Sequence, residues 1–204
     1  MTEHDPDQGV REKLLAFARQ EGAGASDVIA MRAQNLDVSV RKGALEDAVR
    51  SESFGIGLRV FKGSRQAYGS TADASDEGLR KLAAQVCAMA DAVPPDEFSV
   101  LADAGMLAKT IPHLDLYDAG TPLNVAQLGD LAQAAEDAAL GVKGITNSDG
   151  AHAGQGVHWI GLSTSNGFSE GYVHSGAHLS LSMIAGTGDG METDHAGAQA
   201  TYLS

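Results

Sequence analysis

The stretch from Val28 to Thr71 reads VIAMRAQNLDVSVRKGALEDAVRSESFGIGLRVFKGSRQAYGST, and it decides the fold. Apolar and polar residues alternate along it in short runs, which glycine-containing breaks separate. The alternating apolar positions are Leu36, Val38 and Val40 in one run, and Ile56, Leu58 and Val60 in the next. A period of two places successive side chains on opposite faces of an extended chain. Each run therefore predicts a β-strand with one buried face.

The breaks between these runs have the chemistry of tight turns. Lys42-Gly43 separates the first two runs, and Lys62-Gly63-Ser64 follows the second. A third run then alternates through Gln66, Tyr68 and Ser70. Gaps this short that contain glycine join antiparallel neighbours as hairpins. The sequence therefore predicts an antiparallel β-meander with one solvated face, and its other face must be covered by helices.

Two helices are predicted around the meander from apolar residues spaced three and four positions apart. The first ends near Gly22, where a left-handed residue is expected. The second begins after Asp73 or Ser75, either of which can cap it, and ends at Pro94. The apolar positions are Val10, Leu14, Phe17 and Ala18 in the first helix, and Leu79, Leu82, Val86, Met89, Ala90 and Val93 in the second.

The second half of the chain predicts another helix and then further strands. After an extended connector over residues 94–120, Thr121-Pro122 is expected to cap and begin a helix that ends at Gly141. Its inner stripe is predicted at Leu128, Leu131, Ala135 and Ala138. Extended runs are predicted over residues 157–164 and 168–185 and from 191 onward, with turns at 165–167 and 186–190.

Together these elements predict an α+β fold, in which an antiparallel β-meander covered by helices is followed by a second α+β, strand-rich region. We expect a disordered tail over residues 1–9, a first domain over residues 10–110 and a second domain over residues 111–204. The last predicted strand is interrupted at Ser204, so we expect the second domain to lead into a missing C-terminal half.

The composition narrows the classes of function. The chain has 27 acidic and 14 basic residues, a formal charge of −13, and no basic cluster offsets this excess. Because the excess repels phosphate backbones, direct nucleic-acid binding is disfavoured. No apolar run approaches the roughly 20 residues of a membrane span, and the N-terminus does not resemble a signal peptide. The single cysteine, Cys87, is expected to pack as a small hydrophobe in a helix, and a cytoplasmic location fits these features.

The histidines allow a direct test for a catalytic metal. Zinc hydrolysis needs about three converging ligands, an open position for water and a nearby base. Only His174 and His178, among seven histidines, have the spacing i, i+4, and Ser175-Gly176 stands where a metalloprotease helix carries glutamate. The alternation around them predicts a strand, so we expect ordinary histidines on a sheet surface. We predict no catalytic residue and no metal ligand in this chain.

Other short motifs also lack the context that their chemistry requires. No Gly-x-Ser-x-Gly elbow is present, so a serine hydrolase has no support. Gly55 and Gly57 lie inside a predicted strand with no helix after them, which argues against a phosphate-binding loop. The turn at Gly186–Gly190 contains one aspartate, which supplies too few oxygens for calcium.

Several motifs, taken in their order and spacing, resemble the TldD/PmbA family and specifically its PmbA branch, which is also called TldE. In the second half the resemblance rests on Ser165-Asn166-Gly167-Phe168-Ser169, Tyr172, the run His178–Ala185, Gly188–Met191 and Asp194. In the first half it rests on Val38–Gly43, Gly55–Phe61 and Tyr68–Thr71. One departure is His195-Ala196, where relatives tend to carry an aromatic residue.

This resemblance implies a subunit of a two-chain zinc metalloprotease, a heterodimer that processes unstructured peptides. Members of the family are about twice as long as this chain. In the TldD branch, a His-Glu-x-x-x-His helix and a later cysteine supply the zinc site. The PmbA branch is similar in fold but lacks that set. The resemblance therefore implies no cofactor in this chain, zinc in a TldD-like catalytic partner, and an N-terminal fragment of the PmbA type.

The resulting hypothesis is a non-catalytic subunit that helps to hold an extended peptide, by strand addition to a sheet edge. The turn at Ser165, Asn166, Gly167, Phe168 and Ser169 is a candidate contact with substrate or partner, and a plain hairpin tip is the alternative. A second hypothesis is a stand-alone peptide-binding or chaperone-like module. The family also carries the label modulator of DNA gyrase, and the charge of −13 implies that any such effect runs through another protein.

Overall fold

The computed structural model describes residues 5–202 of the chain and shows an α+β fold. Its six strands form one sheet in the order β3-β2-β1-β4-β5-β6, and the pairs β2–β3 and β5–β6 are antiparallel. The predicted fold class is therefore confirmed. The main elements are α1 (Gln8–Gln20), β1 (Ala25–Arg41), β2 (Ala44–Lys62), β3 (Arg65–Thr71), α2 (Asp76–Ala92), α3 (Val125–Leu140), β4 (Ile145–Thr164), β5 (Ser169–Ala185) and β6 (Glu192–Ala200).

The chain divides into two compact units, each built from three separate segments. Unit 1 consists of Met1–Arg32, Ser53–Asp115 and Trp159–Val173, and unit 2 consists of Ala33–Glu52, Leu116–His158 and His174–Ser204. Strands β1, β2, β4 and β5 each contribute residues to both units. The domain boundary predicted near residue 110 stays a prediction.

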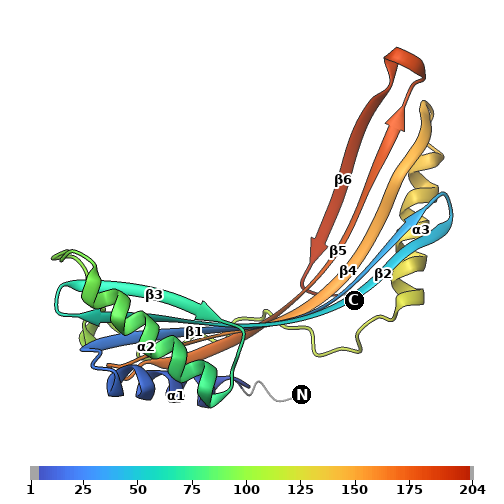
Figure 1. Cartoon of the computed structure of the whole chain (residues 1–204). Helices are drawn as coiled ribbons and strands as arrows, with labels where there is room; N and C mark the ends of the chain where they lie inside the picture. Colours follow the sequence, from blue (N-terminus) through green and yellow to red (C-terminus); the bar gives the residue numbers. More distant parts are fainter. Residues whose placement is uncertain (1–4, 203–204) are drawn as a thin grey trace. The chain divides into compact units, whose positions relative to one another are not determined.

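Unit 1 contains the larger apolar core. Helices α1 and α2 contact each other, α2 also contacts β3, and Figure 1 shows both helices alongside the strands of this unit. The buried residues are Leu14, Phe17, Ala18, Val28, Ala30, Ile56, Leu58, Val60, Ala67, Leu79, Leu82, Ala83, Val86, Cys87 and Ala90. The alternating positions predicted for the second run and most of the predicted helical positions are thus confirmed as core.

Local signals set the ends of these helices. Gly22 follows α1 with φ of 85°, a left-handed conformation that costs glycine little. The Ser75 side chain accepts a hydrogen bond from the Gly78 amide and caps α2, as predicted. The spacing predicts Met89 in the core, but 47% of its surface is exposed. Ala83 and Cys87 occupy inward positions of α2 instead. Burial raises the pKa of the Cys87 thiol, which fits its predicted role as a packed hydrophobe.

Both predicted hairpins of the meander are present. Lys42 and Gly43 have φ of 53° and 71°, so both residues of the β1–β2 turn are left-handed, as in a type I′ turn. Gly63, with φ of 59°, lies in the β2–β3 turn. Strand β3 then pairs with β2 from Lys62↔Arg65 to Ile56↔Thr71.

Unit 2 has a smaller core between α3 and the sheet. Its buried residues are Leu36, Val38, Val40, Leu128, Ala132, Ala151 and Ala153. The partly buried Leu123, Leu179 and Leu181 pack against this cluster. The first run of the meander therefore buries its predicted face, although in a different unit from the second run.

Helix α3 begins later and turns a different face inward than the sequence predicts. Its cap is Asn124, which forms a capping box with Gln127, rather than Thr121-Pro122. The buried positions are Leu128, Ala132 and Glu136. Leu131, with 45% of its surface exposed, and Ala138 face solvent, so the predicted stripe is wrong at these two positions. The difference arises because the inward Glu136 carboxylate accepts hydrogen bonds from the Lys42 and Gly43 amides and the Ser148 hydroxyl. The spacing of apolar residues cannot predict a buried carboxylate.

The strands of the second half are longer than predicted. Strand β4 begins at Ile145, twelve positions before the predicted start at Val157, because glycines at 150, 154 and 156 obscure its alternation. Strand β5 lies where it is predicted, and β6 begins where it is predicted. However, β6 ends at Ala200, so the prediction that this strand runs on to Ser204 is wrong for residues 201–202. The register of the two strands runs from Ala177↔Ala200 to Ala185↔Glu192.

The predicted disordered tail needs a correction in its described part. Residues 1–4 lie outside the described residues. Asp5 binds the buried Arg11 guanidinium, Asp7 binds Arg32, and α1 already begins at Gln8. Residues 5–9 are ordered because these carboxylates have arginine partners, which composition alone does not reveal.

Candidate binding site

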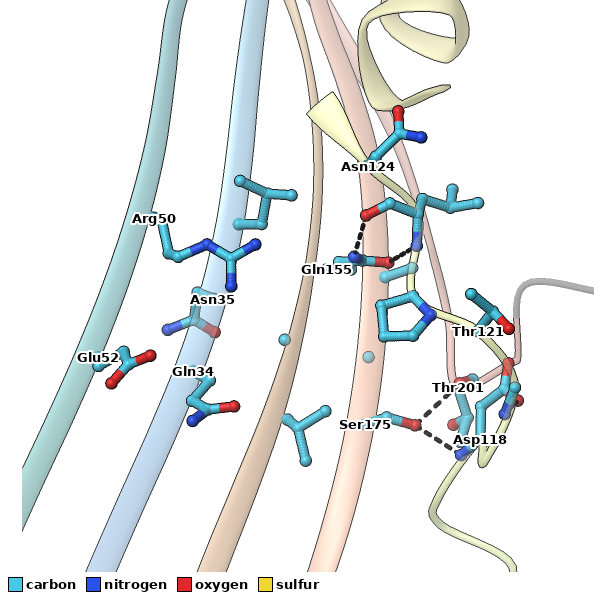
Figure 2. A pocket seen from close by; sticks show the side chains of 18 residues that line it. Gln34, Asn35, Arg50, Glu52, Asp118, Thr121, Asn124, Gln155, Ser175 and Thr201 are labelled. Carbon is cyan, nitrogen blue, oxygen red and sulfur yellow. Dashed lines mark hydrogen bonds between the residues drawn. The ribbon is translucent and has the colours of Figure 1, made fainter. Parts of the chain in front are cut away.

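A cavity of about 290 Å³ lies on one face of the sheet in unit 2. Its lining includes the side chains of Gln34, Asn35, Arg50, Glu52, Asn124 and Gln155, and Figure 2 shows how these residues surround it. We call this cavity the amide trough. The volume is near the lower end of the range for ligand pockets, roughly 300–1,000 Å³, so the trough suits part of a larger ligand.

Gln155 fixes one wall of the trough. Its Nε2 donates to the carbonyl oxygen of Leu123 at 2.7 Å, and its Oε1 accepts from the Leu123 amide at 3.0 Å. The side-chain amide therefore pairs with the extended segment that precedes α3, which we call the connector (residues 107–124). It does so as a backbone amide pairs with a neighbouring strand. Figure 2 shows this pair of bonds on the β4 side of the trough. The clamp holds the connector against the sheet just before α3 begins.

Ser175 fixes the same connector at a second point. Its amide donates to the Leu116 carbonyl at 2.9 Å, and its Oγ accepts from the Asp118 amide at 2.8 Å. The hydroxyl also donates to the Thr201 carbonyl at 3.2 Å. Strand β6 ends at Ala200, which is paired with Ala177 of β5. Beyond that point, at Ser175, β5 forms hydrogen bonds with the connector instead of with β6.

The chemistry of the lining favours binding over catalysis. Side-chain amides offer a donor and an acceptor together, which is the pair that a peptide group presents. Arg50 and Glu52 add one charge of each sign at the β2 side (Figure 2). The lining includes no histidine or cysteine, and its ionisable side chains are Arg50, Glu52 and Asp118.

The strand that carries Arg50 and Glu52 forms an open sheet edge in unit 2. Strand β3 pairs with β2 only between Ile56 and Lys62. Over Ala44–Glu52, every residue of β2 is exposed, and no strand among the described residues pairs with its outer side. Within this segment the Ala48 amide donates to Asp47 Oδ1 at 2.8 Å. The backbone groups of such an edge can accept another chain as an added strand.

The candidate turn at residues 165–169 lies in unit 1, between β4 and β5. Ser165 exchanges two hydrogen bonds with Ser26, and the Asn166 side chain donates to the Ala102 carbonyl at 2.7 Å. Gly167 has φ of 103°, the Phe168 amide donates to Thr164, and the Ser169 hydroxyl meets that of Ser163 at 2.9 Å. These bonds hold the turn in place, and its contact with substrate or partner stays a prediction.

The two histidines with i, i+4 spacing have separate surroundings. The His174 ring stacks on His158, with centroids 4.7 Å apart, whereas His178 Nε2 lies 3.6 Å from Asp37 Oδ1. Four residues of strand span about 13 Å, so the two rings do not converge on one ion. Burial lowers the pKa of His174, and the neighbouring His158 lowers it further. Among residues 5–202 there is no group of three histidine, cysteine or carboxylate residues that could hold a metal.

No sequence pattern marks the residues that form the trough. Gln155 stands between Gly154 and Gly156 in a stretch where the alternation is weak, so nothing marked it as a clamp. Arg50 and Glu52 lie in the part of β2 whose residues are exposed on both faces, and its pattern is uninformative for that reason.

Comparison with known proteins identifies the family. Residues 26–90 match the model of PmbA/TldA metallopeptidase domain 1, and residues 119–202 match that of the PmbA/TldA metallopeptidase central domain. The chain belongs to the PmbA/TldD metallopeptidase family. The resemblance of its motifs to the TldD/PmbA family is therefore confirmed.

Two curated relatives of this family carry the PmbA name. The chain is 32% identical over 186 residues to the metalloprotease PmbA homolog of Haemophilus influenzae, covering 89% of this chain and 40% of that protein. It is 29% identical over 195 residues to the metalloprotease PmbA of Escherichia coli O157:H7, covering 92% and 42% respectively. The chain thus spans about two fifths of the length of these relatives.

Solved structures of the PmbA/TldD type share the fold. A candidate modulator of DNA gyrase from Bacteroides thetaiotaomicron superposes with a TM-score of 0.89 at 22% identity, covering 99% of this chain and 46% of that one. TldE from Thermococcus kodakarensis gives a TM-score of 0.73 at 18% identity, covering 95% and 43%. None of the helices described between residues 5 and 202 is long and apolar enough to cross a membrane.

Proposed function

We propose that this chain is the N-terminal portion of a PmbA/TldE-type subunit, which acts with a TldD-like catalytic chain and holds an unstructured peptide. The observation that carries the proposal is the amide trough beside the open β2 edge. The lining amides of Gln34 and Asn35 are of the kind that pair with peptide groups, and an open edge can accept a strand, so both features suit an extended polypeptide. The relatives named metalloprotease PmbA support a role in proteolysis.

Zinc, which this metallopeptidase family implies, does not fit the described part of the chain. A catalytic zinc needs three protein ligands on one ion, and His174 and His178 face different partners. The family resemblance implies that the His-Glu-x-x-x-His set belongs to the TldD branch. We therefore assign the zinc to the partner chain and derive no catalytic step from the residues of this one. A cytoplasmic heterodimer is part of the same proposal.

The test is a reconstitution with full-length chains. The full-length protein that contains this chain is expressed with and without a TldD relative from the same genome, and zinc content and cleavage of an unfolded peptide are measured. We expect cleavage from the mixture and zinc in the partner. Cleavage by the protein alone, or unchanged cleavage by the partner when this protein is absent, would contradict the proposal.

A second candidate is a peptide-binding or chaperone-like module that acts without a protease. The amide trough favours it equally, because peptide holding does not by itself require a catalytic chain. Peptide binding by the full-length protein, with no effect on cleavage by any TldD relative, would select this alternative.

The gyrase names of the solved relatives suggest a third role, which we propose is indirect. The charge of −13 repels the DNA backbone, so any effect on gyrase would run through a processed peptide or protein. A gel shift of duplex DNA that weakens steeply with salt would instead indicate direct binding.

A further inference from the structure

Building on the proposed function, we propose that a cationic extended peptide adds as a strand to β2 over Ala44–Glu52 and places a lysine or arginine side chain in the amide trough, beside Glu52. The open edge would supply the backbone hydrogen bonds, and the trough would supply the selectivity.

The edge has the length and accessibility that strand addition requires. All residues of Ala44–Glu52 are exposed, and the next strand on that side, β3, pairs only from Ile56 onward. The exposed Leu45 and Val49 offer apolar surface to alternate side chains of an added strand. At about 3.3 Å per residue, an extended peptide of nine residues matches this segment one to one.

The trough lies beside this edge. Arg50 and Glu52 belong to β2 and also line the trough, whereas Asn124 and Gln155 line its other side (Figure 2). A side chain that projects from an added strand toward this face would meet Arg50 and Glu52 first. Gln34 lines the space behind them, and a lysine or arginine head group can donate to its amide oxygen.

The charges select a cationic peptide. The open segment of β2 carries Glu46, Asp47 and Glu52 against the single cation Arg50. Asp118 adds a carboxylate on the connector side of the trough, and the whole chain carries −13. This field raises the association rate of a basic segment and disfavours an acidic one.

The test measures the binding of two peptides of opposite charge to the wild-type chain and to a charge-reversal variant. A fluorescein-labelled nine-residue peptide of alternating lysine and threonine, and its glutamate counterpart, are titrated with the 204-residue chain and followed by fluorescence anisotropy. We expect the lysine peptide to bind more tightly, and Glu52→Lys to weaken it by about five- to tenfold. Glu192→Lys makes the same charge change at the exposed β6 edge and should leave its binding within about twofold.

A second peptide tests strand addition itself. Methylating alternate backbone nitrogens of the lysine peptide removes its donors to the edge while keeping its charge. Binding should fall by at least about tenfold, since several hydrogen bonds are lost together. In hydrogen exchange, the unmodified peptide should slow exchange of amides within 44–52 and leave those of β6 unchanged.

Several results would overturn the inference. These are equal binding of the lysine and glutamate peptides, equal effects of Glu52→Lys and Glu192→Lys, or full binding by the methylated peptide. A concentration-dependent dimer that Glu52→Lys disrupts, seen by light scattering, would assign the edge to a second copy of the chain instead.

The outcome is separable from that of the proposed function. If reconstituted cleavage requires both full-length chains but Glu52→Lys leaves the cleavage of a basic peptide unchanged, the subunit role stands and the β2 site fails. If the lysine peptide binds as expected but no partner produces cleavage, the site stands and the protease role fails.

Discussion

The two units of this chain use the same sheet strands in different ways. The core cluster of unit 1 contains fifteen buried apolar residues beside two helices, whereas that of unit 2 contains seven beside the single helix α3. Unit 2 also has the open β2 segment and the fully exposed strand β6. The difference indicates that unit 1 supplies most of the hydrophobic stabilisation, while unit 2 leaves surface available for other chains.

Each unit has one charged side chain that is completely buried, Arg11 in unit 1 and Glu136 in unit 2, and the two are stabilised differently. In unit 1, Arg11 binds Asp5 and donates to Ser163 Oγ at 2.9 Å, and a Cβ at Gly161 would collide with its guanidinium. In unit 2, Glu136 accepts the amides of Lys42 and Gly43 at 2.8 and 2.9 Å, together with the hydroxyl of Ser148. Unit 1 thus neutralises a buried charge with a carboxylate, and unit 2 solvates one with hydrogen-bond donors at a hairpin.

The largest expected effect tests the claim that unit 1 carries the stability. Leu79→Ala removes a fully buried side chain of α2 and should lower the free energy of unfolding by about 3 kcal/mol. Urea unfolding followed by circular dichroism measures it. Met89→Ala on the same helix is the control and should cost well under about 1 kcal/mol because Met89 is exposed. If Leu128→Ala in α3 lowers the free energy of unfolding more than Leu79→Ala does, the claim that unit 1 carries most of the stability is wrong.

The next effect concerns the buried carboxylate of unit 2. Glu136→Gln should cost about 2 kcal/mol, because an amide cannot accept from all three donors as the carboxylate does. Asp137→Asn, at the exposed neighbouring position, is the control and should be nearly neutral. An equal loss for both variants in urea titration would show that the hairpin does not depend on this carboxylate.

The same site predicts a loss of stability in acid. Burial by itself raises the pKa of Glu136, but the hydrogen bonds from Ser148, Gly43 and Lys42 outweigh it, so the pKa lies below the ordinary value of 4.5. This stabilisation is complete above pH 4.5 and is lost as the pH falls through the folded-state pKa. The Glu136→Gln variant should show a shallower loss of stability below pH 4.5 than the wild-type chain.

A smaller effect tests the connector clamp. Gln155→Ala removes both hydrogen bonds to Leu123 and should lower the free energy of unfolding by about 1 kcal/mol. The main consequence should be more frequent local opening of the connector. Limited proteolysis should cut the variant faster within residues 107–120, while Gln199→Ala on the exposed β6 edge should leave the cutting rate unchanged. Identical cutting of both variants would mean that Ser175 alone holds the connector.

The smallest effect concerns the stacked histidines. Because the pKa of His174 lies below the ordinary value of 6.5, the unfolded chain binds more protons than the folded one just below that pH. Stability should therefore fall by a fraction of a kcal/mol as the pH drops from 7.5 to 5.5. His174→Gln should flatten this slope, measured by urea midpoints at both pH values, and His195→Gln on β6 should not.

Periodicity predicted most of the fold because it reports burial directly. The alternation around Val38 and Leu58 and the spacing of α2 identified their buried faces, and the lysine-glycine pairs identified both hairpins. It failed at α3, because an inward Glu136 is favourable only once the hairpin donors are in place. It also failed along β4, where glycines make room for polar groups from neighbouring strands, such as Asp37 and His178 around Gly154.

The trough could not be predicted because its parts come from distant segments. Gln155 and Leu123 are 32 positions apart, and the exposed Arg50 and Glu52 belong to another strand. Polar residues in extended runs are common on any sheet surface, so only the tertiary structure distinguishes a clamp from a solvated side chain. The turn at residues 165–169, in contrast, was a candidate site because its sequence resembles a family motif. Its hydrogen bonds to Ser26 and Ala102 give it a structural role.

The segmental make-up of the units limits how the protein can be shortened. Each unit is assembled from three stretches separated in sequence, and four strands pass from one unit into the other. No single truncation can therefore release either unit with all of its residues. An autonomous version of unit 2 would require its three segments to be rejoined with engineered linkers, or a circular permutation, rather than a choice of start and stop codons.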